Sequence, residues 1–133
     1  MKTKTIKQTV IFKANPSEVY EALMDSKKHS KFTESECIIS RKVKGKFSVY
    51  DGYAEGINLE LIKDKKIVQK WHASDWPDGH YSIVTFSLTK FNQGTKLIFT
   101  QERVPEKLYK SISEGWHEHY WEKMKNFMNV TSY

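Results

Sequence analysis

Hydrophobic and polar residues alternate over Thr3–Phe12, and one face of this segment consists of Ile6, Gln8, Val10 and Phe12. Alternation with a period of two residues is typical of a β-strand that buries one face and exposes the other. We therefore expect the chain to open with a half-buried strand.

A strong helix start follows this strand. In Asn15-Pro16-Ser17-Glu18, asparagine can cap a helix, proline fits the first helical position, and a glutamate follows where a capping box needs it. The apolar positions that follow repeat at helical spacing and stop near Asp25. We predict a first helix that ends there and a second short helix around Lys28–Phe32.

From Ile38 onward the pattern changes to short β-branched or alternating runs that are separated by turn residues. Turn residues at such regular intervals indicate an antiparallel meander. The predicted strands lie near residues 37–43, 46–51, 53–63, 66–74, 80–91 and 94–103.

Beyond Pro105 the spacing of apolar residues becomes three or four, through Leu108, Ile112, Trp116, Tyr120, Met124 and Phe127. This period predicts one long amphipathic helix. Nothing else in the chain could cover the concave face of the sheet, so the helix must lie across it. The predicted fold is α+β, with a curved antiparallel sheet of six or seven strands and two short helices after the first strand.

The segment from Lys66 to Phe86 reads as a hairpin with an aromatic corner at Trp76-Pro77-Asp78-Gly79-His80. Its Trp71 is expected to face the final helix. The corner itself has two readings: it braces the fold, or it is offered to a partner as an exposed anchor.

Composition limits the class of protein. A length of 133 residues with 38% hydrophobic residues fits a single domain over 1–133, and no apolar run reaches the roughly 18 to 20 residues of a membrane span. The residues after Met1 lack the apolar core of a secretory signal, which favours a cytosolic protein. Cys37 is the only cysteine, so an intrachain disulfide is excluded.

The net charge of +6 is unevenly distributed. Residues 1–50 contain 11 Lys and Arg against 5 Asp and Glu, whereas residues 51–133 contain 11 of each. One interpretation is a solvated lysine face; the other is electrostatic attraction to an acidic partner. The basic residues concerned are Lys27, Lys28, Lys31, Arg41, Lys42, Lys44 and Lys46.

No motif for catalysis, metal binding or cofactor binding emerges. His117 and His119 lie two apart on a helix and so point in different directions, whereas a zinc pair needs a spacing of four. Phosphate loops, nucleophile elbows and paired carboxylates are absent. Aromatic residues cluster in the hairpin and the last helix, whereas the excess positive charge is N-terminal, which argues against nucleic-acid binding. We expect no enzyme, no cofactor and no membrane or nucleic-acid partner.

Several short patterns together resemble one family. They are Pro16 with Val19-Tyr20 and Ala22-Leu23, Phe32-Thr33, Gly45-Lys46-Phe47, Asp51-Gly52, Gly56, Ile67-Val68 with Trp71, Trp76-Pro77 with Gly79-His80, Gly94-Thr95 with Leu97, Pro105, and Gly115-Trp116 with Tyr120-Trp121. In these positions the chain resembles the C-terminal-type domain of activators of heat shock protein 90 (Hsp90) ATPase, within the START-like SRPBCC helix-grip superfamily. Lys44 and His72 depart from the family pattern.

The resemblance implies a helix-grip fold and a co-chaperone that binds Hsp90 and modulates its ATPase. We expect a monomer. Because Met1 directly precedes the first strand, we expect no separate N-terminal activator domain. The expected partner surface comprises Lys27, Lys28, Lys31, Arg41, Lys42, Lys44, Lys46, Trp76 and His80. The rival reading is a carrier or sensor that holds an apolar ligand or lipid under the last helix, in a cavity lined by Trp71, Phe86, Trp116, Tyr120 and Met124.

Overall fold

The computed structural model describes residues 1–131, with side chains described as far as Met128. Its strands form one seven-stranded antiparallel sheet in the order β1-β7-β6-β5-β4-β3-β2. The elements are β1 (Thr3–Phe12), α1 (Pro16–Met24), α2 (Ser26–Thr33), β2 (Ile38–Ile39), β3 (Lys46–Val49), β4 (Ala54–Ile62), β5 (Lys66–Ala73), β6 (Ser82–Phe91), β7 (Gly94–Pro105), the 3-10 helix η1 (Glu106–Leu108), α3 (Tyr109–Trp116), the π-helix η2 (His117–Trp121) and α4 (Glu122–Thr131).

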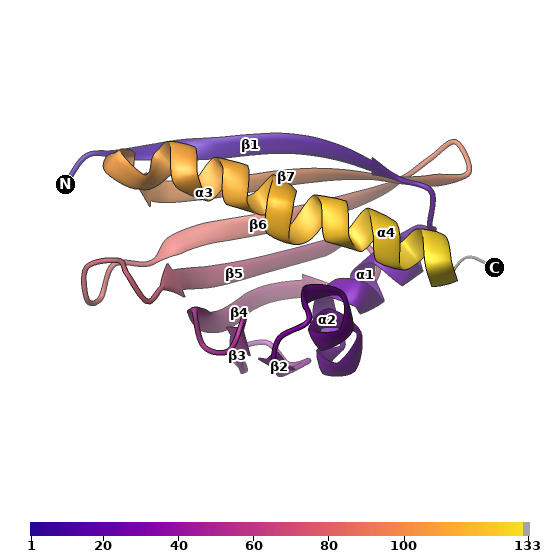
Figure 1. Cartoon of the computed structure of the whole chain (residues 1–133), viewed down its shortest axis with the longest axis horizontal. Helices are drawn as coiled ribbons and strands as arrows, with labels where there is room; N and C mark the ends of the chain where they lie inside the picture. The colour runs from indigo at the N-terminus through magenta and orange to yellow at the C-terminus, as the bar shows by residue number, and fades with distance from the viewer. Residues whose placement is uncertain (132–133) are drawn as a thin grey trace.

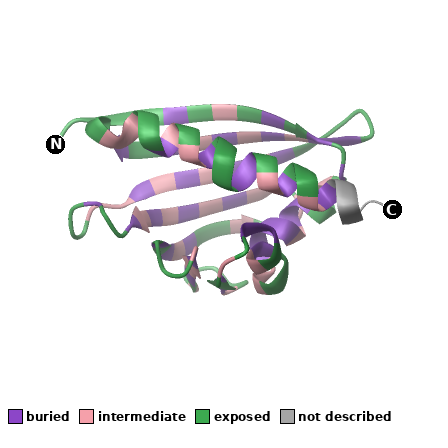
Figure 2. Cartoon of the chain, viewed as in Figure 1, coloured by how far each residue is buried: buried purple, intermediate pink, exposed green. Residues whose placement is uncertain are grey.

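The C-terminal helical segment lies diagonally across one face of the curved sheet, while α1 and α2 pack at one end (Figure 1). Buried and partly exposed residues alternate along the central strands, and buried positions also mark the helix (Figure 2). The core therefore lies between the sheet and this helix, as the apolar patterns predict. The predicted α+β helix-grip architecture is confirmed.

The first helix starts at the predicted asparagine cap, whereas the second helix, predicted around Lys28–Phe32, starts earlier and spans Ser26–Thr33. Asn15 caps α1 by accepting the Glu18 N–H at 2.9 Å, and Asp25 caps α2 by accepting the Lys28 N–H at 3.0 Å. Each cap satisfies a backbone donor that the helix itself cannot pair. Asp25 also separates the two helices, which is why the first one ends at Met24.

The strand predicted over residues 37–43 is wrong in length, because only Ile38–Ile39 pair with β3. The chain bends back after Ser40 and passes so close to itself that a Cβ at Gly45 would lie 2.0 Å from Ser40 Oγ. Asn58 from β4 holds this bend by donating to the carbonyls of Ser40 at 2.8 Å and Lys42 at 3.0 Å. A side chain distant in sequence thus replaces the missing strand pairing.

Two serines of α2 cover the outer edge of β2. The Ile39 N–H donates to Ser26 Oγ at 2.8 Å, and the Cys37 N–H donates to Ser30 Oγ at 2.9 Å. Each hydroxyl also donates back to the carbonyl of the same residue. An exposed strand edge invites pairing with other chains, and this pair of serines removes that possibility over residues 37–39.

The predicted long helix is correct in position but is not uniform. A π-turn over His117–Trp121 inserts an extra residue, so Tyr120 and Trp121 are both buried. Trp121 was not among the predicted core positions, which assumed an unbroken helical period. Its Nε1–H donates to Gln8 Oε1 on β1 at 2.7 Å, and the Trp116 Nε1–H donates to Gln101 Oε1 on β7 at 2.7 Å. These bonds fix the helix against the sheet.

Candidate functional site

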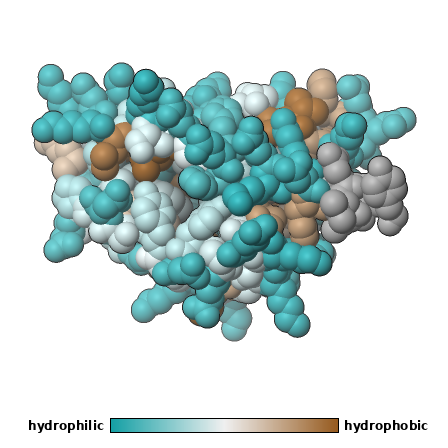
Figure 3. All heavy atoms as spheres, viewed as in Figure 1, coloured by the Kyte–Doolittle hydropathy of each residue, from teal (hydrophilic) through white to brown (hydrophobic). Residues whose placement is uncertain are grey.

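The predicted basic surface lies at the β2 edge of the sheet. Lys27, Lys28 and Lys31 are exposed on α2, and Lys42, Lys44 and Lys46 are exposed between β2 and the start of β3. The serine bonds between α2 and residues 37–39 bring the two groups to the same edge. Hydrophilic atoms cover this lower part of the molecule (Figure 3). The chain thus presents two lysine clusters, which we call the lysine face, close to one another.

Arg41 differs from these lysines. Its guanidinium makes two hydrogen bonds to the Glu21 carboxylate, at 3.1 and 2.5 Å. The bond to Glu21 raises the pKa of Arg41. A bidentate pair of this kind neutralises the charge locally, so Arg41 contributes less to the positive surface than the sequence suggested.

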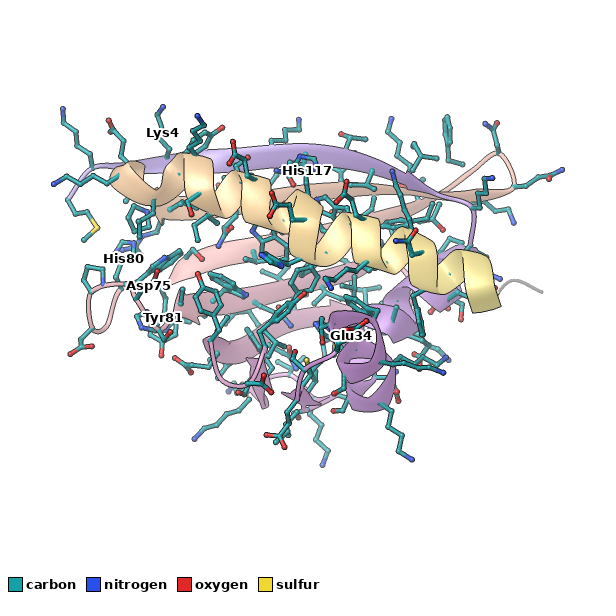
Figure 4. The ribbon with its side chains drawn as sticks, viewed as in Figure 1. Lys4, Glu34, Asp75, His80, Tyr81 and His117 are labelled. Carbon is teal, nitrogen blue, oxygen red and sulfur yellow. The ribbon has the colours of Figure 1, made fainter. Side chains whose placement is uncertain are left out.

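The aromatic corner is a brace. Trp76 is 4% exposed and packs against Trp71, with ring centroids 5.4 Å apart, so its predicted role as an exposed partner contact is wrong. His80 is half-exposed and donates from Nε2 to the Arg103 carbonyl at 2.7 Å, while its own carbonyl accepts from His72 Nδ1 at 2.7 Å. Figure 4 shows His80 in this loop beside the ends of β5 and β6. The His80 bond to Arg103 ties the corner to β7, and the Trp76 ring is buried in the hydrophobic core.

An open groove of about 410 Å³ lies between the first part of the C-terminal helical segment and the β3–β4 turn. Its walls are mainly aromatic, with few polar atoms, as in many ligand pockets. It is lined by Val49, Tyr50, Tyr53, Ala54, Trp71, Ser111, Ile112, Gly115, Trp116, His119 and Tyr120. We call it the outer groove.

Deeper in the molecule an inner void of about 20 Å³ lies against the centre of the sheet. That volume is large enough for one water molecule and too small for an organic ligand. Trp71, Phe86, Trp116 and Tyr120 line the void as predicted. Met124 is buried but lines neither cavity, so its predicted place in a cavity wall is wrong. Large aromatic side chains fill most of the space that a lipid would need.

A buried polar pair closes the far side of the inner void. His29 on α2 donates from Nδ1 to the Leu23 carbonyl at 3.0 Å, and its Nε2 accepts the Tyr120 hydroxyl at 2.9 Å. Burial lowers the pKa of His29 to about 4 and raises the pKa of Tyr120. Both groups are therefore neutral at physiological pH. The pair ties α2 to the π-turn.

The sequence did not predict several residues that line these cavities, namely His29, Tyr50, Tyr53, Gly115 and His119. Gly115 could have pointed to the outer groove, because glycine destabilises a helix interior and is usually kept there for a packing or functional reason. Within the described structure, a Cβ at Gly115 would meet only His119 Cδ2, at 3.8 Å. The glycine therefore keeps the wall of the outer groove low, and neither packing nor backbone conformation requires it.

The described residues contain no cluster of three or more histidine, cysteine or acidic side chains that could hold a metal ion. His117, labelled beside β1 in Figure 4, is exposed. None of the described helices is long and apolar enough to cross a membrane.

Residues 13–129 match the family model described as "Activator of Hsp90 ATPase homolog 1-like protein". The chain belongs to this AHSA1-like family. The match covers both candidate surfaces, the lysine face and the outer groove.

Curated relatives carry matching names. An activator of 90 kDa heat shock protein ATPase homolog from Dictyostelium discoideum is 30% identical over 131 residues, which cover 98% of this chain and 34% of the relative. Activator homolog 1 from Homo sapiens is 29% identical over 91% of this chain and 35% of its own length. The AHSA1-like chain thus spans about a third of the curated relatives it matches.

Solved structures agree with the fold. An HSP90 activator from Plasmodium falciparum superposes with a TM-score of 0.88 at 25% identity, covering 94% of this chain and 96% of that one. The Aha1 dimer from Colwellia psychrerythraea, at 19% identity and a TM-score of 0.80 over 92% of this chain and 94% of that one, shares the fold.

Proposed function

We propose that this AHSA1-like protein is a cytosolic co-chaperone that binds Hsp90 and modulates its ATPase, acting by binding rather than by catalysis. The observation that carries the proposal is the likeness to the Plasmodium falciparum HSP90 activator, which extends over nearly the full length of both chains. The names of the curated relatives support the same partner. We propose that the protein acts as a monomer.

The lysine face is the surface we assign to the chaperone. Its lysines are exposed and converge from α2 and the β2–β3 connection onto one edge of the sheet. Clustered charge of one sign accelerates association with a surface of opposite sign and favours the correct orientation. The proposal therefore requires an acidic surface on Hsp90.

Calorimetric titration of the protein with purified Hsp90 tests this assignment. The variant Lys27→Glu, Lys28→Glu, Lys31→Glu should weaken binding by about tenfold or more, because it reverses the sign of one cluster. The matched control is Lys2→Glu, Lys7→Glu, Lys107→Glu, which makes the same change in net charge at exposed positions. These lie in or near β1, at the opposite edge of the sheet.

Absence of heat at high micromolar concentrations, with no change in Hsp90 ATP turnover, would contradict the function itself. If both triple variants bind Hsp90 as tightly as the parent protein, the lysine face is excluded as the binding surface, but the proposed function is not. If both variants lose the same affinity, net charge rather than the lysine face drives association.

A second candidate function rests on the outer groove, whose volume of about 410 Å³ and aromatic lining suit a small apolar ligand. We use the fluorescent probe 1-anilinonaphthalene-8-sulfonate as the test ligand. Gly115→Leu should abolish its binding by filling the groove, whereas Gly115→Ala should retain it, because the added methyl group meets no close neighbour. Binding that survives in the leucine variant would exclude the groove as the site.

A further inference from the structure

The turn between β3 and β4 has an unusual backbone. Tyr50, Asp51 and Gly52 have φ values of 52°, 54° and 89°, so three consecutive residues occupy the left-handed region. Glycine tolerates this conformation, but a tyrosine rarely adopts it because its Cβ crowds the backbone. Strain of this kind persists only where surrounding contacts impose it.

Contacts on two sides hold the turn. On the side of the sheet, the Tyr53 N–H donates to the Tyr50 carbonyl at 3.0 Å, the Ser74 N–H donates to the Tyr53 carbonyl at 2.7 Å, and the Tyr53 ring packs against Trp71. The Tyr50 hydroxyl donates to the backbone carbonyl of His119 in the π-turn. The Asp51 N–H donates to the Glu36 carbonyl at 3.0 Å, and Asp51 Oδ1 accepts the Glu36 N–H at 2.7 Å. The Tyr50 ring also makes edge contacts with the rings of His119 and Tyr120. Among the described residues, the Tyr50 hydroxyl bond and the Tyr50 ring contacts join the turn to the helix.

The same turn borders the partition between the two cavities, because the Tyr50 ring packs against Tyr120 and the Tyr53 ring packs against Trp71. Four residues line both the outer groove and the inner void: Val49, Trp71, Trp116 and Tyr120. Tyr50 lines the outer groove but not the inner void. The partition between them is therefore made of side chains, and the Tyr50 ring packs directly against one of its members, Tyr120.

We propose that the Tyr50–Tyr53 turn is a movable closure of the outer groove: it opens when the Tyr50 hydroxyl releases the His119 carbonyl, and opening removes the ring contact between Tyr50 and Tyr120 in the partition. Opening breaks the hydroxyl bond but relaxes a strained backbone, so the relief of strain offsets part of its cost. The π-turn supplies the acceptor carbonyl, and π-turns occur frequently at functional sites. This inference does not depend on which partner or ligand the protein binds.

Amide hydrogen exchange of the full chain tests the closure. In Tyr50→Phe the amides of Glu36, Asp51 and Tyr53 should exchange about tenfold faster, because the variant lacks one hydrogen bond in the closed form. Amides of β1 and β7 should be unchanged. Acrylamide should quench the tryptophan fluorescence more strongly, because Trp71 and Trp116 line both cavities.

Two further variants make the test specific. Gly52→Ala leaves the Tyr50 hydroxyl in place but increases the strain, since its φ is 89° and nothing lies within 4 Å to clash; it should accelerate exchange at the same amides by about fivefold. Tyr81→Phe removes a comparable hydroxyl bond, to Glu55 at 2.7 Å, and should leave these amides unchanged. The closure is overturned if exchange in Tyr50→Phe is unaltered at the turn, or rises equally across the sheet.

Discussion

His29 illustrates how a single buried side chain can make the fold sensitive to pH. It is 4% exposed, and its two ring nitrogens join the Leu23 carbonyl and the Tyr120 hydroxyl. Protonation at Nε2 would remove the acceptor for the Tyr120 hydroxyl and place a charge in an apolar interior. The bonds described above therefore require the neutral imidazole.

We expect stability to fall as pH drops from about 6.5 toward 4. The unfolded chain takes up a proton near pH 6.5, whereas the folded chain does so only near pH 4, so acid favours the unfolded state across this window. The loss between pH 7.5 and 4.5 should be about 2 to 3 kcal/mol. Urea denaturation at the two pH values should show this loss of unfolding free energy in the parent protein. The variant His29→Gln should not show it, because glutamine has no group that titrates. Equal pH dependence in both would exclude His29 as the cause.

At the scale of elements, the short strand β2 depends on α2. Ser26 and Ser30 are four apart on this helix and so share a face, from which they reach the backbone of Cys37 and Ile39. The sequence predicted a longer strand here because its β-branched residues suit a sheet. It gave no sign that hydroxyl groups from a helix would replace a neighbouring strand.

Removing these hydroxyls should destabilise the edge. Ser26→Ala and Ser30→Ala each leave a backbone N–H of a buried residue without its partner, which should cost about 1 to 2 kcal/mol. Ser17→Ala, at an exposed position in α1, is the control and should change stability by less than about 0.5 kcal/mol. The double variant should also self-associate more readily in light scattering, because it exposes a strand edge. Unchanged stability would show that water replaces the hydroxyls.

The C-terminal helix shows the same limit of sequence patterns. Its position and its buried Ile112, Trp116 and Tyr120 follow from a period of three to four residues. The π-turn does not follow from this period. One inserted residue leaves the sequence rich in apolar residues at similar spacing, but it changes which side chains point toward the sheet. That register is fixed by tertiary contacts, in which Trp121 packs against Phe99 and donates to Gln8 while Trp116 donates to Gln101.

At the scale of the whole molecule, charge is distributed unevenly in space as well as in sequence. Six of the ten lysines in the first 50 residues lie at the β2 edge, while Arg41 is paired with Glu21. If the lysine face binds Hsp90, affinity should fall as salt rises from 50 to 300 mM, because exposed charges are screened. Calorimetry over this range measures the effect. A salt-independent affinity would favour an apolar contact such as the outer groove.

The sequence by itself determined the α+β class, the order of the elements, the capped first helix and the position of the final helix against the sheet. These features depend on local caps, turns and periodicity, which neighbouring residues encode. Tertiary structure alone decided that Trp76 is buried, that Met124 lies away from the cavities, and that Tyr50 meets His119. These outcomes depend on contacts between residues far apart in the chain, whose geometry is fixed only when the sheet curves around the helix.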